Sequence, residues 1–144
     1  MNLLQEFTVE LPLADVLSAN GGRGNPKAHG RKVKNIIDRT QIALRGLKAM
    51  DSTFVVVQVF KATNRKYDAS NLHETCKPMI DAVVRRGLLE DDDNDHLIGP
   101  LPVHGGVDRS LARKNALVPE RVRFRVLFFD DFYVRQGLAN AVEV

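Results

Sequence analysis

The chain has 144 residues, 44% of them hydrophobic, which suits one small domain with a buried core. Its single cysteine, Cys76, excludes an internal disulfide framework and a paired-cysteine metal site. No apolar run approaches the ~18 residues that a membrane-spanning helix needs. We therefore expect a single domain over residues 1–144, in a reducing compartment and with no membrane partner.

Charge is unevenly distributed along the chain, although the net charge is only +3. Eight basic residues lie in 21–48 against Asp38 alone, and six lie in 109–125 against Glu120 alone. The acidic residues concentrate at 90–95. This segregation favours a basic surface for phosphate groups around an acidic centre. The alternative is ordinary solvated charge on helices and loops.

The first half of the chain predicts a strand, a loop, a helix and a second strand. Alternating apolar and polar residues indicate a strand over 5–11. Four glycines and a proline make 18–30 a loop, and its glycines lack the GK[ST] ending of a nucleotide-binding loop, so no nucleotide cofactor is expected. Apolar spacing predicts a helix over 31–49. The β-branched run 53–61 is typical of a central, buried strand.

The second half predicts a helix, two strands and a tail. A helix over 71–86 has Pro78 within it, which indicates an irregular opening at 71–75. Two prolines suggest that the short strand 96–103 lies at a sheet edge, and strict alternation predicts a strand over 121–129. Residues 130–144 read as a tail without pattern, a candidate for packing on a partner. The fold class is α/β (α+β), in the order β-α-β-α-β-β, with a mixed sheet packed against two helices and a dimer expected.

Carboxylates gather at two points that flank the helix 71–86. Asp68 follows the buried strand, and Asp91-Asp92-Asp93-Asn94-Asp95 precedes the next one. An EF-hand is excluded because His96 and Pro102 replace its required glycine and glutamate. Neighbouring carboxylates repel one another, and a bound cation relieves that cost. The pattern suggests a site for Mg²⁺, and a solvated turn is the alternative.

The spacing of these residues resembles a known family. Asp68-x-Ser70-Asn71-Leu72, then Lys77-x-x-x-Asp81-Ala82, then Gly87-x-x-x-Asp91-Asp92 resembles the RusA-type Holliday-junction resolvases. Their pattern is D-x-D-N-L, a lysine, D-A-L, a glycine and D-D. The match is close over about residues 66–98, and it places three extra residues, 73–75, before the lysine. A weaker likeness to the N-terminal region of the family involves Leu11, Pro12, Asn20 and Arg23.

The resemblance implies a homodimeric endodeoxyribonuclease that cuts four-way DNA junctions with Mg²⁺ or Mn²⁺, in the cytoplasm of a bacterium or encoded by a phage. It assigns catalysis to Asp68, Asp92 and Lys77. It assigns the metal to Asp68, Asp91 and Asp92, with Ser70 in place of the family's second aspartate. A serine hydroxyl can bind Mg²⁺ but brings no charge, so Glu74 or Asp93 is a candidate substitute. The alternative for Lys77 is a surface ion pair with Asp81.

Basic residues would grip DNA phosphates without reading bases. The candidates are Arg23, Arg31, Lys32, Lys34, Arg65 and Lys66. Two other hypotheses remain open. The first is a protein that binds branched DNA with weak or no cleavage, because Ser70 has removed a ligand. The second is a basic domain whose acidic cluster is only a solvated turn.

Overall fold

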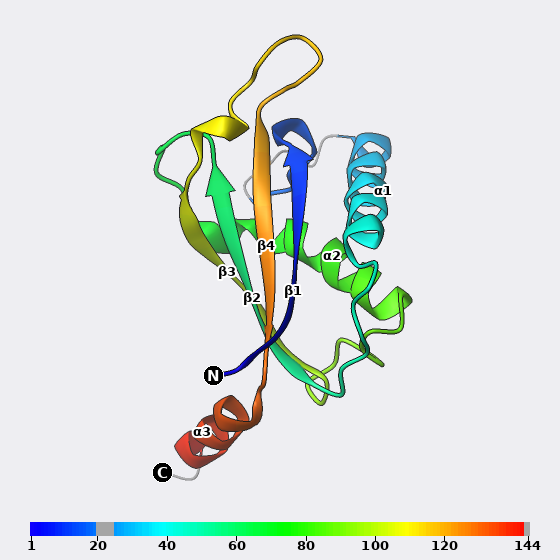
Figure 1. The fold of residues 1–144 in the computed structure, drawn as a ribbon, viewed down its shortest axis with the longest axis vertical. Coiled ribbons are helices and arrows are strands. Elements are labelled where there is room, and N and C mark those ends of the chain that lie inside the picture. Colours follow the sequence, from blue (N-terminus) through cyan, green and yellow to red (C-terminus); the bar gives the residue numbers. More distant parts are fainter. Residues whose placement is uncertain (20–24, 143–144) are drawn as a thin grey trace.

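The computed structural model describes residues 1–19 and 25–142, which form one α+β domain (Figure 1). The sheet order is β1-β4-β2-β3, so the mixed sheet and the fold class are confirmed. Short 3₁₀ turns stand at Leu13–Asp15, Ala69–Leu72 and Arg109–Leu111. The longer elements are β1 (Leu3–Pro12), α1 (Pro26–Ala43), β2 (Thr53–Lys61), α2 (His73–Arg85), β3 (Leu97–Val107), β4 (Arg121–Phe129) and α3 (Phe132–Val142).

The two inner strands, β2 and β4, are the two whose limits the sequence predicted. β4 pairs antiparallel with β1 and β2, and β2 pairs parallel with β3. Along β2, Val55, Val57 and Val59 are buried while the residues between them are only half-buried. Helices α1 and α2 therefore cover one face of the sheet, and the other face is open (Figure 1). The predicted edge position of the proline-containing strand is confirmed for β3.

The helices differ from prediction at their ends. α1 begins at Pro26 rather than at residue 31, because the Asn25 side chain caps it by accepting from the Lys27 and Ala28 amides at 3.1 and 3.3 Å. It ends at Ala43, before the predicted limit of 49.

α2 is preceded by the expected irregular opening, a 3₁₀ turn over Ala69–Leu72, and it carries Pro78 in its interior. The proline removes one backbone donor. The helix nevertheless continues, because Cys76, Met79, Ile80 and Val83 on its apolar face are buried against the sheet.

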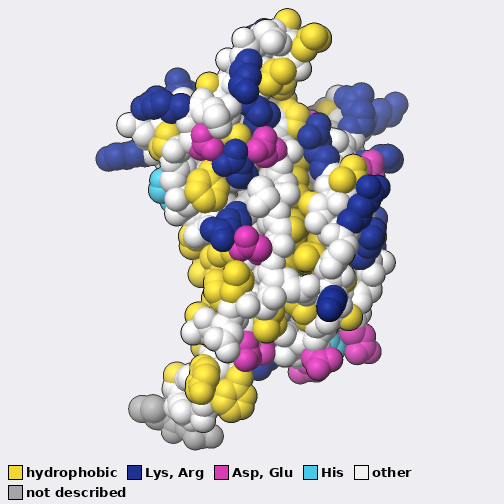
Figure 2. Space-filling model, viewed as in Figure 1, with side chains coloured by type: hydrophobic (Ala, Val, Ile, Leu, Met, Phe, Trp, Pro, Cys, Tyr) yellow, Lys and Arg dark blue, Asp and Glu magenta, His cyan; other side chains and the backbone are white. Residues whose placement is uncertain are grey.

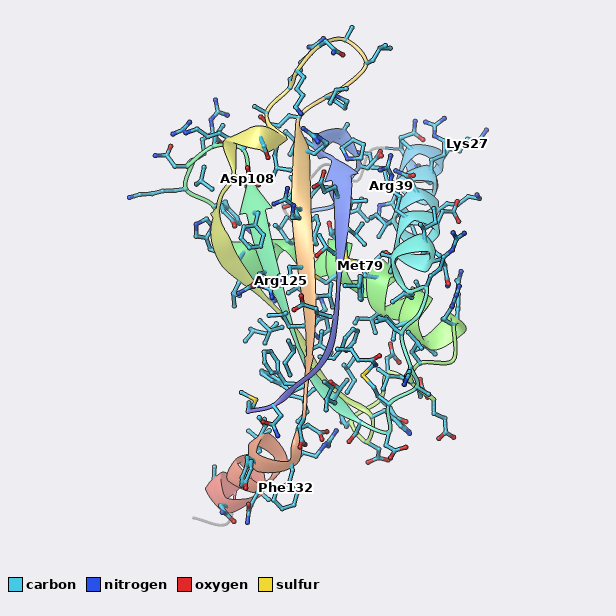
Figure 3. All side chains as sticks on the ribbon, in the orientation of Figure 1. Lys27, Arg39, Met79, Asp108, Arg125 and Phe132 are labelled. Atoms are coloured by element: carbon cyan, nitrogen blue, oxygen red, sulfur yellow. The ribbon has the colours of Figure 1, made fainter. Side chains whose placement is uncertain are left out.

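The patternless tail was a wrong prediction, because residues from Phe132 form α3. This helix projects from the end of the sheet, with Phe132 and Tyr133 exposed (Figures 1 and 3). Arg135 holds it by donating to Asp131 at 2.6 Å and to the Asn94 carbonyl at 2.7 Å. Local contacts rather than a buried stripe stabilise α3, so periodicity could not reveal it. No helix in the described ranges 1–19 and 25–142 is long and apolar enough to span a bilayer.

Candidate functional site

Asp68 lies just beyond the end of β2 and caps the 3₁₀ turn that leads into α2. Its Oδ1 accepts from the Ser70 hydroxyl at 2.7 Å and from the Ser70 amide at 3.0 Å. These two bonds lower the pKa of the exposed Asp68 carboxyl below its usual value. Asp68 is therefore ionised at neutral pH. Among the described residues, none donates to its second oxygen, Oδ2, which leaves that atom open to a cation.

Ser70 is held against Asp68 by the same hydroxyl bond, and it is exposed. Replacing Ser70 by aspartate would put a second carboxylate beside the first, and their repulsion would be relieved by a shared cation.

We therefore expect Ser70→Asp to lower the Mg²⁺ concentration needed for half-maximal cation binding by about tenfold, equivalent to ~1.4 kcal/mol. Calorimetric titration with Mg²⁺ measures this value. Ser110→Asp is the matched control, because Ser110 makes the same pair of bonds with Asp108 at another strand end. An unchanged titration for Ser70→Asp would place residue 70 away from any metal.

The acidic cluster lies between α2 and β3, and part of it is already engaged. Asp93 is bonded to the His96 ring and to the Asp95 amide, and Glu90 lies 3.4 Å from His96 Nε2. The hydrogen bond that the His96 ring donates to Asp93 is the main reason that the pKa of His96 is raised. Asp91 accepts from the Asp92 amide at 2.7 Å. Asp92 is exposed and lines a hollow of about 410 Å³ together with Arg135 and Leu138.

The structure does not bring Asp68 and Asp92 together within one chain. β2 and β3 run parallel, with Thr53 beside Leu97 and Lys61 beside Val107. Asp68 follows the end of β2, whereas Asp92 precedes the start of β3, so the two lie at opposite ends of the sheet (Figure 1). A strand of nine residues is about 30 Å long at ~3.3 Å per residue. No group of three or more His, Cys, Asp or Glu side chains in the described part of the chain is arranged to hold a metal.

Lys77 is exposed on the half of α2 nearer to Asp68. Within residues 1–19 and 25–142 it forms no ion pair with Asp81, so the pair that was the alternative to a catalytic role is not present in this structure. Its position is compatible with contact to a bound polyanion.

The predicted DNA-binding residues that the structure describes come from the first half of α1 and from the turn before Asp68, which both lie at the Asp68 end of the sheet (Figure 1). Arg31, Arg65 and Lys66 are exposed there, and Lys32 is half-buried. Lys34 is bonded to Asp38 at 2.9 Å, which offsets part of its charge. Arg23 lies outside the described residues. Figure 2 shows Lys and Arg side chains gathered mainly over the upper part of the molecule. Arg45, Lys48, Arg85 and Arg86 are exposed nearer to the acidic cluster, so the separation of charge is partial.

The arginines of β4 are occupied within the domain. On the open face of the sheet, Arg125 contacts Glu6 at 2.8 Å, and Arg123 contacts Glu10 at 3.0 Å and Asp108 at 2.7 Å (Figure 3). Hydrogen bonds from Ser110 and then from Arg123 lower the pKa of Asp108 to about 2. The expectation that the basic residues of 109–125 contribute to a phosphate-binding surface is therefore not supported for Arg123 and Arg125, because both are already paired with carboxylates.

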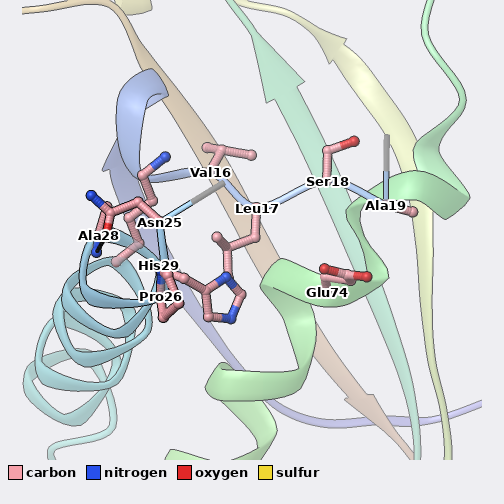
Figure 4. A pocket seen from close by; sticks show the side chains of 10 residues that line it. Val16, Leu17, Ser18, Ala19, Asn25, Pro26, Ala28, His29 and Glu74 are labelled. Atoms are coloured by element: carbon pink, nitrogen blue, oxygen red, sulfur yellow. Dashed lines mark hydrogen bonds between the residues drawn. The ribbon is translucent and has the colours of Figure 1, made fainter. Parts of the chain in front are cut away.

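Two adjoining hollows open at the Asp68 end. One, of about 650 Å³, lies between the starts of α1 and α2 and is lined by His29, Lys32 and Glu74 among other residues (Figure 4). The other, of about 440 Å³, contains Asp68 and Asn71. Val16 and Ser18 line both. Glu74, a candidate substitute for the family's second aspartate, therefore faces the hollow next to that of Asp68.

Three residues of the Asp68 end escaped sequence reasoning. Lys61 lines the same hollow as Asp68 and Tyr67, and Tyr67 is bonded to His104 on β3. No motif links these residues. Only the parallel pairing of β2 with β3 brings His104 beside the end of β2.

Comparison with models of protein families and with curated proteins finds no match to this chain.

Proposed function

We propose that the protein is a metal-dependent endodeoxyribonuclease that cuts four-way DNA junctions as a homodimer, using Mg²⁺ or Mn²⁺. The observation that carries the proposal is the Asp68 turn. It offers an exposed, ionised carboxylate at the basic end of the domain, beside two hollows and immediately before the helix that bears Lys77. Carboxylate oxygens suit Mg²⁺, and the surrounding basic surface suits a phosphate backbone.

The separation of Asp68 from Asp92 favours a site shared between two copies. A two-fold dimer uses the same surface of both copies. If the Asp68 end of one copy contacts a given part of its partner, the Asp68 end of the partner contacts the same part of the first copy. If the copies lie antiparallel, the basic end of each faces the acidic end of the other. Opposite charges then attract at both ends. Such a pairing would bring Asp68 of one copy to Asp91 and Asp92 of the other, and would do so twice.

Two equivalent sites would suit a substrate that itself has near two-fold symmetry. Asp68 and Asp92 would hold the cation, with Ser70 and Asp91 beside them, and Lys77 would neutralise charge that develops on the phosphate. The bound cation would polarise the scissile phosphate and favour ionisation of an attacking water. Paired sites on one dimer explain how symmetric nicks could arise.

The proposal is tested by incubating the purified protein with a labelled four-way junction in Mg²⁺, in Mn²⁺ or in EDTA. We expect paired nicks that require a divalent metal, with linear duplex of the same sequence left uncut. Absence of nicking in either metal would overturn the nuclease assignment.

A second candidate is a branched-DNA-binding protein with weak or no cleavage. It is favoured by Ser70, which stands where the family has a carboxylate and whose hydroxyl is already bonded to Asp68. Metal-independent binding of the junction without nicking would identify this case. Neither binding nor nicking would leave a basic domain whose acidic cluster is a solvated turn.

Phosphate contacts at the basic end predict a steep salt dependence of junction binding. Log affinity should fall by ~0.9 per neutralised phosphate as log salt rises. We expect Arg31→Glu to weaken binding and to reduce that slope by about 1. Arg45→Glu is the matched control, because Arg45 is exposed beyond the opposite end of α1. Equal effects of the two charge reversals on affinity and slope would contradict a localised basic surface.

A further inference from the structure

Lys61, Tyr67 and His104 form a connected cluster on the rim of the sheet. Lys61 ends β2, and its Nζ lies 4.0 Å from the centre of the Tyr67 ring. The Tyr67 hydroxyl is 2.8 Å from His104 Nδ1, and the two rings meet edge to face. Each contact fixes the next, so the Lys61 side chain is held in place rather than free to move in solvent.

The charge of Lys61 is not neutralised within the domain. In the described residues it has no carboxylate within ion-pair distance, although the charge of Glu120 acts on it from farther away. Lys61 is half-buried, and this burial lowers its pKa. A half-buried lysine that only completed the core would be expected to have a paired charge or an end turned to solvent. Lys61 instead lies over a tyrosine ring that lines the same hollow.

The hollow joins this cation to Asp68. Lys61, Tyr67, Asp68 and Asn71 all line its 440 Å³, yet Lys61 and Asp68 do not pair with each other. A cation and a carboxylate held apart across a hollow leave room for a group that interacts with both. A phosphodiester does so when its oxygens meet the ammonium directly and meet the carboxylate through a divalent cation.

We propose that this hollow binds a backbone phosphate of DNA, with Lys61 contacting the phosphate and with Tyr67 and His104 as positioning residues. The inference rests on the proposed nuclease function and adds Lys61 as the charge that binds the phosphate, whereas Lys77 keeps its proposed role toward charge that develops during cleavage. Lys77, by contrast, is not among the residues that line the hollow. The Tyr67 ring contacts the Lys61 ammonium group through its face, and the hydrogen bond to His104 fixes the orientation of that ring.

Binding can be followed without any cleavage, because the chain has two tyrosines and no tryptophan. In a Tyr133→Phe background, Tyr67 is the only fluorescent tyrosine, and Tyr133 is exposed on α3 far from the hollow. The probe is an abasic phosphodiester oligomer, which carries the backbone charge and does not absorb with tyrosine. We expect a saturable change in Tyr67 emission in EDTA. Lys61→Met should weaken the apparent affinity about tenfold, the effect of losing one charge-assisted contact.

Nicking of the junction supplies the second readout. At saturating DNA, Lys61→Met should lower the nicking rate by ~10²-fold, as loss of one donor to a developing charge does in other enzymes. Tyr67→Phe, which keeps the ring and removes the bond to His104, should lower the rate by less than Lys61→Met. Lys48→Met is the matched control, because Lys48 is exposed and does not line the hollow, and it should change both readouts less than Lys61→Met does.

The outcomes separate this inference from the nuclease proposal. If the wild type nicks junctions while Lys61→Met changes neither emission nor rate, the inference is overturned and the nuclease proposal stands. If no metal supports nicking but Tyr67 still responds to the oligomer in a Lys61-dependent way, the phosphate site stands and the nuclease proposal fails. A response that Lys48→Met weakens as much as Lys61→Met would be non-specific and would also overturn the inference.

Discussion

Asp68→Asn and Asp92→Asn proteins, each unable to nick a four-way junction alone, are expected to recover nicking when they are mixed. In a shared site, a mixed dimer combines intact Asp68 from one copy with intact Asp92 from the other. The second site of that mixed dimer carries both Asp68→Asn and Asp92→Asn and is inactive. Random mixing gives half mixed dimers with one working site of two, so about a quarter of the wild-type sites should be active. Those dimers should make single rather than paired nicks.

The alternative geometry gives the opposite result. If each chain held its own metal with its own Asp68 and Asp92, every site in the mixture would lack one ligand, and nicking would stay absent. A mixture of Asp68→Asn with Asp68→Ala is the matched control, because no pairing of these two restores Asp68. The singly substituted proteins should still bind the junction, since loss of a metal ligand removes negative charge near the phosphates. Recovery in the control mixture would contradict a shared site.

The inner strands were predictable because a local pattern and a tertiary role coincide there. Residues 53–61 form an almost continuous apolar run, and 121–129 alternate arginine with apolar residues. Both are central strands, in which the buried face selects one side chain in two. The limits of α1 were predicted wrongly at both ends, because there the local pattern and the tertiary role do not coincide. Its capping Asn25 lies in a glycine-rich stretch, where composition argued for a loop.

The candidate site was only partly predictable. The segment from Asp68 to Asp92 is short and resembles a single motif, which suggested that both aspartates contribute to one site within the same chain. Helix α2 has 13 residues and therefore carries the chain about 20 Å at 1.5 Å per residue, away from Asp68. Spacing along a chain cannot tell whether two ligands meet in one copy or across two. Nor could it reveal the contact of Tyr67 with His104, which depends on how β2 and β3 pair.

Removing the side chain of Leu11 in β1 is expected to cause a large loss of stability. Leu11 is fully buried, and its neighbour across the strand pair is Val122. Leu11→Ala removes its contacts and leaves a cavity that the sheet can fill only in part, so we expect the free energy of unfolding to fall by ~2–5 kcal/mol. Equilibrium unfolding in urea, at one protein concentration, measures the change.

Leu117→Ala is the matched control for that substitution. Leu117 lies in the loop before β4 and is 91% exposed, so the same deletion of atoms should alter the free energy of unfolding by less than ~0.5 kcal/mol. Because both variants replace leucine by alanine, a difference between them reports the effect of burial alone. Similar effects at the two positions would mean that Leu11 does not belong to the buried core.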